Sequence, residues 1–305
     1  MAFPDGIGCP THVLVTHPPR RPIRQRNPPP GKGRTGDSRG AVIPACVSST
    51  RIALLLFVGV WSASRASAQD PFEIHVYEYE PLSWRQYSLE AHLTFLAQGT
   101  AARDSTLLPT QRQTHLTLEP TFGVSPDFAI GFMFLNAWQP GYSPQFAGWR
   151  VLPHFYAPGS WGLPVRLGFV AEFSFQKTRY EENSRRVELR PILDREFARW
   201  QVVFNPVFER AMHGPGTRRG WNFEPALLVR WKRKAFSPSL EYYGEIESIN
   251  VPPRAQPEVH QLFVGGDWEL RPGFGINLGT GFDLGSNGPG IVLKSRFEWD
   301  WRAHH

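Results

Sequence analysis

The sequence of 305 residues contains only two cysteines, Cys9 and Cys46, and both lie in its first fifty residues. Because the rest of the chain has no cysteine, disulfides, thiolate nucleophiles and cysteine zinc sites are excluded there. Long apolar runs are also missing. The run at residues 52–61 is about half of the ~20 residues that a membrane-spanning helix requires, so an uncleaved helical anchor there is disfavoured.

The first part of the chain resembles a leader rather than a folded domain. Residues 1–50 are rich in proline, glycine and arginine and have no hydrophobic periodicity, which predicts a disordered basic segment. Arg51, the apolar run and Ala66-Ser67-Ala68 match the three regions of a signal peptide. We predict a signal peptide at residues 51–68, cleaved after Ala68. Residues 1–50 also fit a start codon assigned too early.

Excess positive charge is absent once the leader is removed. Nine of the 33 basic residues and two of the 27 acidic residues precede residue 69, which leaves 24 basic and 25 acidic ones. The formal charge of +6 thus belongs to the leader. Nucleic acid is therefore not a predicted partner.

Strict alternation of residue types dominates the chain after residue 68. In the closing stretch 291–301, Phe297 and Trp299 share one face while Lys294 and Arg296 share the other. A period of two indicates a strand, and an apolar face opposite a charged face is typical of outer-membrane barrels. About twelve such segments occur. We predict an all-β fold, a single transmembrane antiparallel β-barrel of about 12 strands at residues 87–301, with residues 302–305 as a tail.

Short and long connections alternate between the predicted strands. Residues 125–127, 197–199 and 271–273 are short, whereas residues 98–111 and 247–258 are long. Bacterial barrels have short periplasmic turns and longer outer loops. We expect the bacterial outer membrane as location, both termini in the periplasm, and outer-membrane lipids and the barrel-assembly machinery as partners.

Tryptophans cluster near the predicted strand ends, as expected where amphipathic indoles meet a membrane interface. A soluble sandwich with these aromatics in its core is the alternative. The predicted membrane-interface residues are Trp149, Trp200, Trp221, Trp231, Trp268, Trp299 and Trp301.

Five prolines conflict with a regular barrel, because they fall within strands at predicted lipid-facing positions. Proline cannot donate a ladder hydrogen bond, and a closed barrel has no edge strand to hold it. We expect β-bulges at these sites. The residues are Pro120, Pro153, Pro191, Pro206 and Pro225.

Three segments resemble those of uncharacterised bacterial outer-membrane barrel proteins. They are residues 119–124 (Glu-Pro-Thr-Phe-Gly-Val), 128–131 (Phe-Ala-Ile-Gly) and 149–153 (Trp-Arg-Val-Leu-Pro). These proteins are similar, more loosely, to the transporter-like family linked to the meta-cleavage pathway of phenol degradation. The resemblance implies a single barrel and passage of small molecules, and it implies no particular functional residue.

The charged faces of the strands should line a lumen with more acids than bases. Two interpretations remain open, a pore that favours cations and a closed barrel filled by paired charges with a structural or loop-binding role. Residues 69–86 precede the first confident strand and form either a periplasmic extension or a plug. The predicted lumen residues are Glu119, Arg150, Arg166, Glu172, Glu188, Arg190, Glu209, Glu224, Arg230, Glu241, Asp267, Lys294, Arg296 and Glu298.

Catalytic patterns are absent from the part of the sequence after the leader. It has no H-x-x-x-H pair, no G-x-S-x-G and no phosphate-binding glycine loop. We therefore predict a channel or transporter for small solutes, not an enzyme, without cofactor or metal. A barrel enzyme acting on lipids or peptides is the less favoured alternative, with Glu181, Glu182 and His213 as its candidates.

Inward histidines are the remaining chemical signal. His92, His115 and His154 fall on predicted inner faces, which suggests either a metal site or a Ser-His pair such as Ser174 with His154. Scattered inward histidines more often serve as polar lining. We therefore expect lining.

Overall fold

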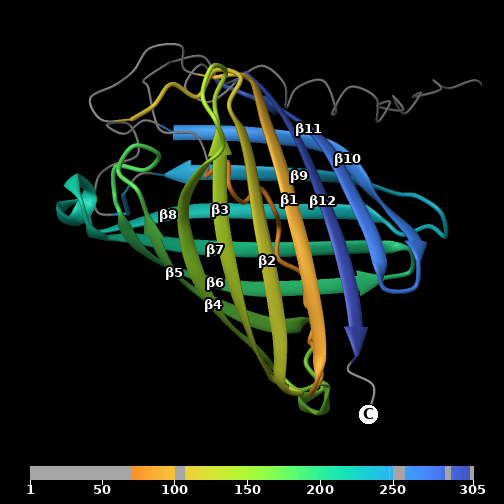
Figure 1. The fold of residues 1–305 in the computed structure, drawn as a ribbon. Coiled ribbons are helices and arrows are strands. Elements are labelled where there is room, and N and C mark those ends of the chain that lie inside the picture. Colours follow the sequence, from red (N-terminus) through yellow and green to blue (C-terminus); the bar gives the residue numbers. More distant parts are fainter. Residues whose placement is uncertain (1–69, 100–106, 247, 250–257, 286–289, 303–305) are drawn as a thin grey trace, which may run out of the picture. The chain divides into compact units, whose positions relative to one another are not determined.

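The structure is a computed structural model that describes residues 70–99, 107–246, 248–249, 258–285 and 290–302. The predictions for the leader at residues 1–50, the signal peptide at 51–68 and the end of the tail at 303–305 lie outside these residues. Each strand pairs antiparallel with its neighbours in sequence, and β1 pairs with β12, so the sheet closes (Figure 1). The predicted all-β barrel of about 12 strands is confirmed. The strands are β1 (Gln86–Gln98), β2 (Thr114–Ser125), β3 (Phe128–Trp138), β4 (Gln145–Tyr156), β5 (Arg166–Gln176), β6 (Arg185–Phe197), β7 (Trp200–His213), β8 (Trp221–Trp231), β9 (Ser237–Ile246), β10 (Glu258–Arg271), β11 (Phe274–Asp283) and β12 (Ile291–Arg302).

Helical structure is minimal in the part of the chain that the structure describes. It consists of two short 3-10 turns, η2 (Gly159–Trp161) and η3 (Pro215–Arg218). No described helix has the length and apolar character needed to cross a membrane.

The connections define two ends of the barrel. The short-turn end, where β1 begins and β12 ends, has links at residues 126–127, 157–165, 198–199, 232–236 and 272–273. The long-loop end has links at residues 99–113, 139–144, 177–184, 214–220, 247–257 and 284–290. Two of the tight links use left-handed backbone, with φ of 54° at Ala198 and 74° at Gly273, as two-residue hairpins require.

The wall has an apolar outer face. Each of the twelve strands contributes at least one large apolar side chain that is more than a third exposed. Soluble monomers rarely expose a contiguous apolar surface of this kind, whereas a lipid-facing barrel must. Examples from eight strands are Leu93, Leu118, Phe134, Phe155, Phe173, Phe204, Val264 and Leu293.

Tryptophans lie close to both ends of the strands. Trp200 and Trp231 stack on each other at the short-turn end, with ring centroids 6.1 Å apart. Trp268, Trp299 and Trp301 are also near this end. At the long-loop end, Trp221 begins β8 and Trp149 follows the start of β4.

The five strand prolines interrupt ladders without bulges, so the expected bulges are wrong. Across β2 and β3 the pairs run from Leu118 with Phe134 directly to Thr121 with Gly131, which leaves Pro120 unpaired in an unchanged register. Pro153, Pro191, Pro206 and Pro225 fall in similar gaps between β4 and β5, β6 and β7, and β8 and β9. The missing proline N–H therefore costs a few ladder hydrogen bonds on one side only, and the other side stays paired.

True register shifts occur elsewhere, toward strand ends. They lie at Leu96/Gln98, Gly123/Ser125, Leu135/Asn136, Arg185/Arg186 and Glu269/Arg271. Bulges at these places adjust the twist where pairing ends.

Candidate functional site

The predicted lumen residues lie on the inner face of the wall. Because the outer face is exposed and apolar, a buried charge on a wall strand must lie inside. Of the predicted lumen residues, nine are buried and five are half-buried. The buried ones are Glu119, Arg150, Glu172, Glu188, Arg190, Glu209, Glu241, Lys294 and Arg296, and the half-buried ones are Arg166, Glu224, Arg230, Asp267 and Glu298.

Residues 70–80, which we call the lumen segment, run through the interior before β1 begins. The segment begins with a turn in which the Glu73 N–H donates to the Asp70 carbonyl at 3.2 Å, and Phe72, Ile74 and Val76 are at most 6% exposed. Asp70 pairs with Arg186 at the start of β6, beside the long-loop end, whereas Glu78 pairs with Arg230 near the end of β8, beside the short-turn end. The chain therefore reaches β1 from the opposite half of the barrel.

Ion pairs join the first half of the lumen segment to the wall. The Glu73 carboxylate accepts hydrogen bonds from Arg150 at 2.7 Å and from Arg190 at 2.8 Å. Asp70 pairs with Arg150 and, at 2.6 Å, with Arg186. Breaking one partner of a buried pair costs about 3–5 kcal/mol, because the other charge is left uncompensated. These contacts therefore hold the segment firmly in its present position.

Hydrogen bonds from side chains of the wall to the segment's backbone fix its position. The Asn205 side chain accepts from the Tyr77 N–H at 2.8 Å and donates to the Tyr77 carbonyl at 3.0 Å, as a neighbouring strand would. Thr117 donates to the Phe72 carbonyl at 2.8 Å, and Lys294 donates to that of Ile74 at 3.1 Å. These bonds satisfy backbone groups that would otherwise be orphaned inside the barrel.

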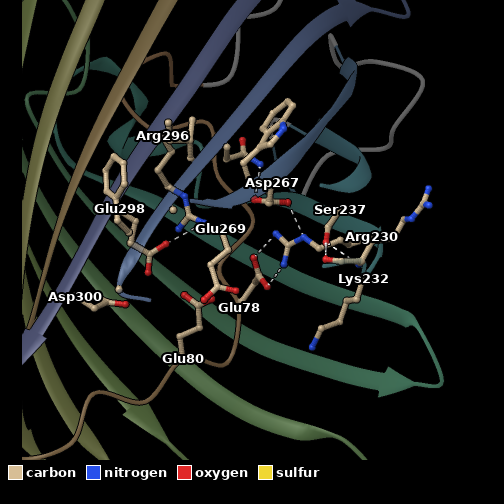
Figure 2. A pocket seen from close by; sticks show the side chains of 17 residues that line it. Glu78, Glu80, Arg230, Lys232, Ser237, Asp267, Glu269, Arg296, Glu298 and Asp300 are labelled. Atoms are coloured by element: carbon tan, nitrogen blue, oxygen red, sulfur yellow. Dashed lines mark hydrogen bonds and ion pairs between the residues drawn. The ribbon is translucent and has the colours of Figure 1, made fainter. Parts of the chain in front are cut away.

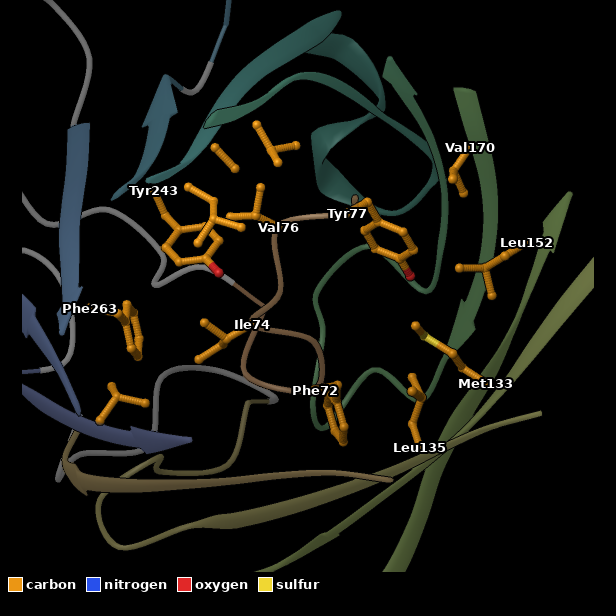
Figure 3. Packing of buried hydrophobic residues seen from close by; sticks show 14 of the residues in the cluster. Phe72, Ile74, Val76, Tyr77, Met133, Leu135, Leu152, Val170, Tyr243 and Phe263 are labelled. Atoms are coloured by element: carbon orange, nitrogen blue, oxygen red, sulfur yellow. The ribbon is translucent and has the colours of Figure 1, made fainter. Parts of the chain in front are cut away.

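Apolar packing completes the contact between segment and wall (Figure 3). Phe72 and Tyr77 lie toward the side of Met133, Leu135 and Leu152, whereas Ile74 and Val76 lie toward Tyr243 and Phe263. The interior thus holds an apolar band as well as charges. The lumen residues predicted from the sequence were all charged, so this apolar band was not predicted.

A cavity of about 340 Å³ opens at the short-turn end, where the segment leaves the lumen (Figure 2). The Arg230 guanidinium donates hydrogen bonds to both carboxylate oxygens of Glu78, at 2.5 and 2.7 Å, and one to Asp267 at 2.7 Å. Six acids and four bases line this cavity, so its formal charge is net negative. The acids are Glu78, Glu80, Asp267, Glu269, Glu298 and Asp300, and the bases are Arg230, Lys232, Arg233 and Arg296.

Arg186 also faces the lumen, although it was not among the predicted lumen residues. The structure puts it at the start of β6, facing inward, with Glu209 at 2.5 Å and Asp70 at 2.6 Å. A strand start beside a long loop gives no clear phase, so the error lies in a boundary. The acids of the lumen segment were also left out of the predicted charge balance.

The candidates for catalysis are engaged in local contacts. Glu181 accepts from the Asn183 N–H at 3.0 Å, and His213 pairs with Ser184 at 3.0 Å. Glu182 lies in the same link, residues 177–184. The suggested Ser174–His154 pair is not formed, because Ser174 donates to Gln176, while the His154 Nδ1 faces the Tyr156 hydroxyl at 3.3 Å.

Comparison with known proteins supports the fold. The chain resembles an outer-membrane channel from Pseudomonas putida F1 with a TM-score of 0.52 and 11% identity, over 75% of this chain and 100% of that one. The barrel has the fold of an outer-membrane channel. Weaker likenesses are to Salmonella typhi OmpF in complex with daunomycin (TM-score 0.34, 8% identity, 71% and 97% covered) and to the outer-membrane channel DcaP of Acinetobacter baumannii (TM-score 0.31, 8% identity, 71% and 96% covered).

Sequence comparison adds no assignment. No family model matches the chain, and no curated protein matches it. The resemblance to the family linked to phenol degradation therefore stays a prediction.

Proposed function

We propose that the chain is an outer-membrane channel for small solutes, with the short-turn end in the periplasm. The observation that carries the proposal is a closed barrel, apolar outside, whose ionised interior is threaded along its length by the lumen segment. A solute must pass beside this segment or displace it. The sequence resembles the family linked to phenol degradation, and this resemblance suggests small organic molecules as the transported solutes.

The excess of acids at the short-turn cavity favours cations over anions. Carboxylates that line a narrow entrance raise the local cation concentration and set selectivity. Glu269 and Asp300 are exposed there, at the opening of the cavity. Purified protein in planar bilayers should conduct, with a reversal potential on the cation-selective side.

Reversing one charge of the cavity should weaken this preference. We expect Glu269→Lys to lower the ratio of cation to anion permeability about twofold in dilute salt, since two unit charges are changed near the entrance with little screening. Reversal potentials in a salt gradient measure the ratio. Asp127→Lys is the matched control, because Asp127 is an exposed acid of the same end that does not line the cavity. Equal shifts in both variants would contradict a selective entrance.

A closed barrel with a structural or binding role is the second candidate. It is favoured by the ion pairs, amide hydrogen bonds and apolar contacts with which the lumen segment fills the interior. Bilayers that stay sealed at every voltage, with correctly folded protein inserted, would support this role over conduction.

A further inference from the structure

Two glutamates face each other across the inner side of β1 and β2. Glu90 is opposite Glu119 in the register, and His92 lies two residues along β1 on the same face. The His92 Nε2 is 3.2 Å from a Glu119 oxygen and 3.4 Å from a Glu90 oxygen. Like charges directly opposite on a sheet destabilise it unless a cation lies between them. Arg296, at 3.0 Å, compensates Glu90, and no basic side chain of the described residues forms a salt bridge with Glu119 apart from His92.

A second histidine lies near this cluster, on β4. His154 is 5% exposed, and its Nε2 has no hydrogen-bond partner among the described residues. Three polar atoms surround Gly131, because a Cβ built on it would lie 3.0 Å from the Thr121 hydroxyl, 3.2 Å from that Nε2 and 3.4 Å from the second oxygen of Glu119. Glu119 thus presents one oxygen to His92 and the other to the neighbourhood of Gly131, where the His154 Nε2 also lies.

The surroundings of His154 suit a metal ligand. With its Nδ1 protonated and donating to the Tyr156 hydroxyl at 3.3 Å, its Nε2 keeps a free lone pair. Such an outer hydrogen bond is what fixes the tautomer and orientation of metal-binding histidines. His75 of the lumen segment approaches from the inner side, with its ring centroid 6.0 Å from that of His92.

The spacing of the ligand atoms fits a tetrahedral ion. One ligand atom from each of Glu90, His92 and Glu119 lies within 4.8 Å of the others. Ligands about 2.0–2.1 Å from a tetrahedral zinc are about 3.3 Å apart, close to the observed 3.2 and 3.4 Å. A set that mixes imidazole nitrogen and carboxylate oxygen favours a transition ion such as zinc over calcium or magnesium.

We propose that Glu90, His92 and Glu119 bind one divalent transition-metal ion of the zinc class, and that His154 takes the fourth position once its side chain turns toward the ion. The site rests on the fold and is independent of whether the barrel conducts. It lies where β1, β2 and β4 meet the lumen segment, so the ion would bridge parts of the wall that are distant in sequence. In the sequence analysis we weighed a metal site at His92 and His154 but expected these histidines to be polar lining.

Zinc binding to the full-length folded chain tests the proposal. After chelator treatment, zinc is titrated against a chromophoric competitor, and cobalt is added in parallel to follow its visible absorption. The wild type should bind one more ion per chain than His92→Gln, and His154→Gln should weaken that site about tenfold or more. Binding should also weaken as the pH falls, because protons compete for the imidazoles.

His115→Gln is the matched control, because His115 is equally buried in the lumen but packs edge-on against Phe72 at 4.3 Å, outside the site. Heat-dependent gel mobility verifies that each variant is folded, and Glu119→Gln replaces His92→Gln if the latter fails. Equal zinc uptake by the wild type and the folded His92 or Glu119 variant would overturn the proposal. The proposal would also be overturned if the chain bound calcium instead of zinc and His154→Gln left that calcium binding unchanged.

Discussion

Glu73→Gln should loosen the lumen segment by about 3 kcal/mol, which raises the population of the released state more than a hundredfold. The substitution keeps the shape of the side chain but removes the charge that Arg150 and Arg190 share. Both arginines keep other partners, Glu172 and Glu188, so the wall should remain folded. The effect should therefore be confined to the segment.

Thiol labelling at Val76→Cys measures this release. Val76 is 1% exposed, so a thiol there reacts only when the segment leaves the wall. In a chain that starts at Gln69 no other cysteine is present. Labelling should be about a hundredfold faster with Glu73→Gln, in line with the same free energy. Glu80→Gln is the control, because Glu80 is exposed at the end of the segment. Equal labelling rates in all three chains would show that Glu73 does not hold the segment.

Val264→Arg should destabilise the barrel by about 2–4 kcal/mol in phospholipid bilayers, because a charge at the midplane faces hydrocarbon. Val264 lies at the middle of β10 and is 55% exposed on the outer face. Leu270→Arg on the same strand should cost only about 0–1 kcal/mol, since Leu270 is near the short-turn end, beyond Trp268.

Urea unfolding in vesicles, followed by tryptophan fluorescence, gives both free energies of unfolding. The two variants carry the same charge on similarly exposed positions of one strand, so only their depth differs. If both cost the same, the outer face does not lie in a membrane in the orientation proposed above.

The strand content of the chain could be predicted because two different environments act on the wall. Ion pairs inside select residues such as Arg150 and Glu172, while the apolar outside selects residues such as Phe155 and Phe173. This contrast gives a period of two that is visible without any other information. The lengths of the links could be predicted as well, because the alternation of apolar and polar residues stops where each link begins and resumes where it ends.

β3 shows where this signal fails. Its inward residues, including Met133 and Leu135, are as apolar as outward ones such as Phe134. They pack on the lumen segment rather than on water, and a strand that is apolar on both faces carries no alternation. The apolar band of the interior therefore could not be predicted without knowing that the lumen segment packs against β3.

The partners of the lumen segment were equally hidden from the sequence. Asp70, Glu73 and Glu78 each bind bases that lie about 80 to 150 residues away, and no local pattern encodes such distances.

The bulges expected at the strand prolines were wrong for a different reason. Pro191 and Pro206 face each other across one ladder gap, so two missing donors share a single interruption.

The lumen segment also couples the kinetics of folding to the topology of the chain. Ile74 accepts its hydrogen bond from Lys294, 220 residues later, and β1 closes onto β12 over a similar separation. Loops of this length must be closed before these contacts can stabilise anything, which slows folding. Because the segment precedes every strand yet is enclosed by all of them, closure of the last seam and filling of the interior must be completed together. Assembly of this barrel should therefore end in one cooperative, rate-limiting step.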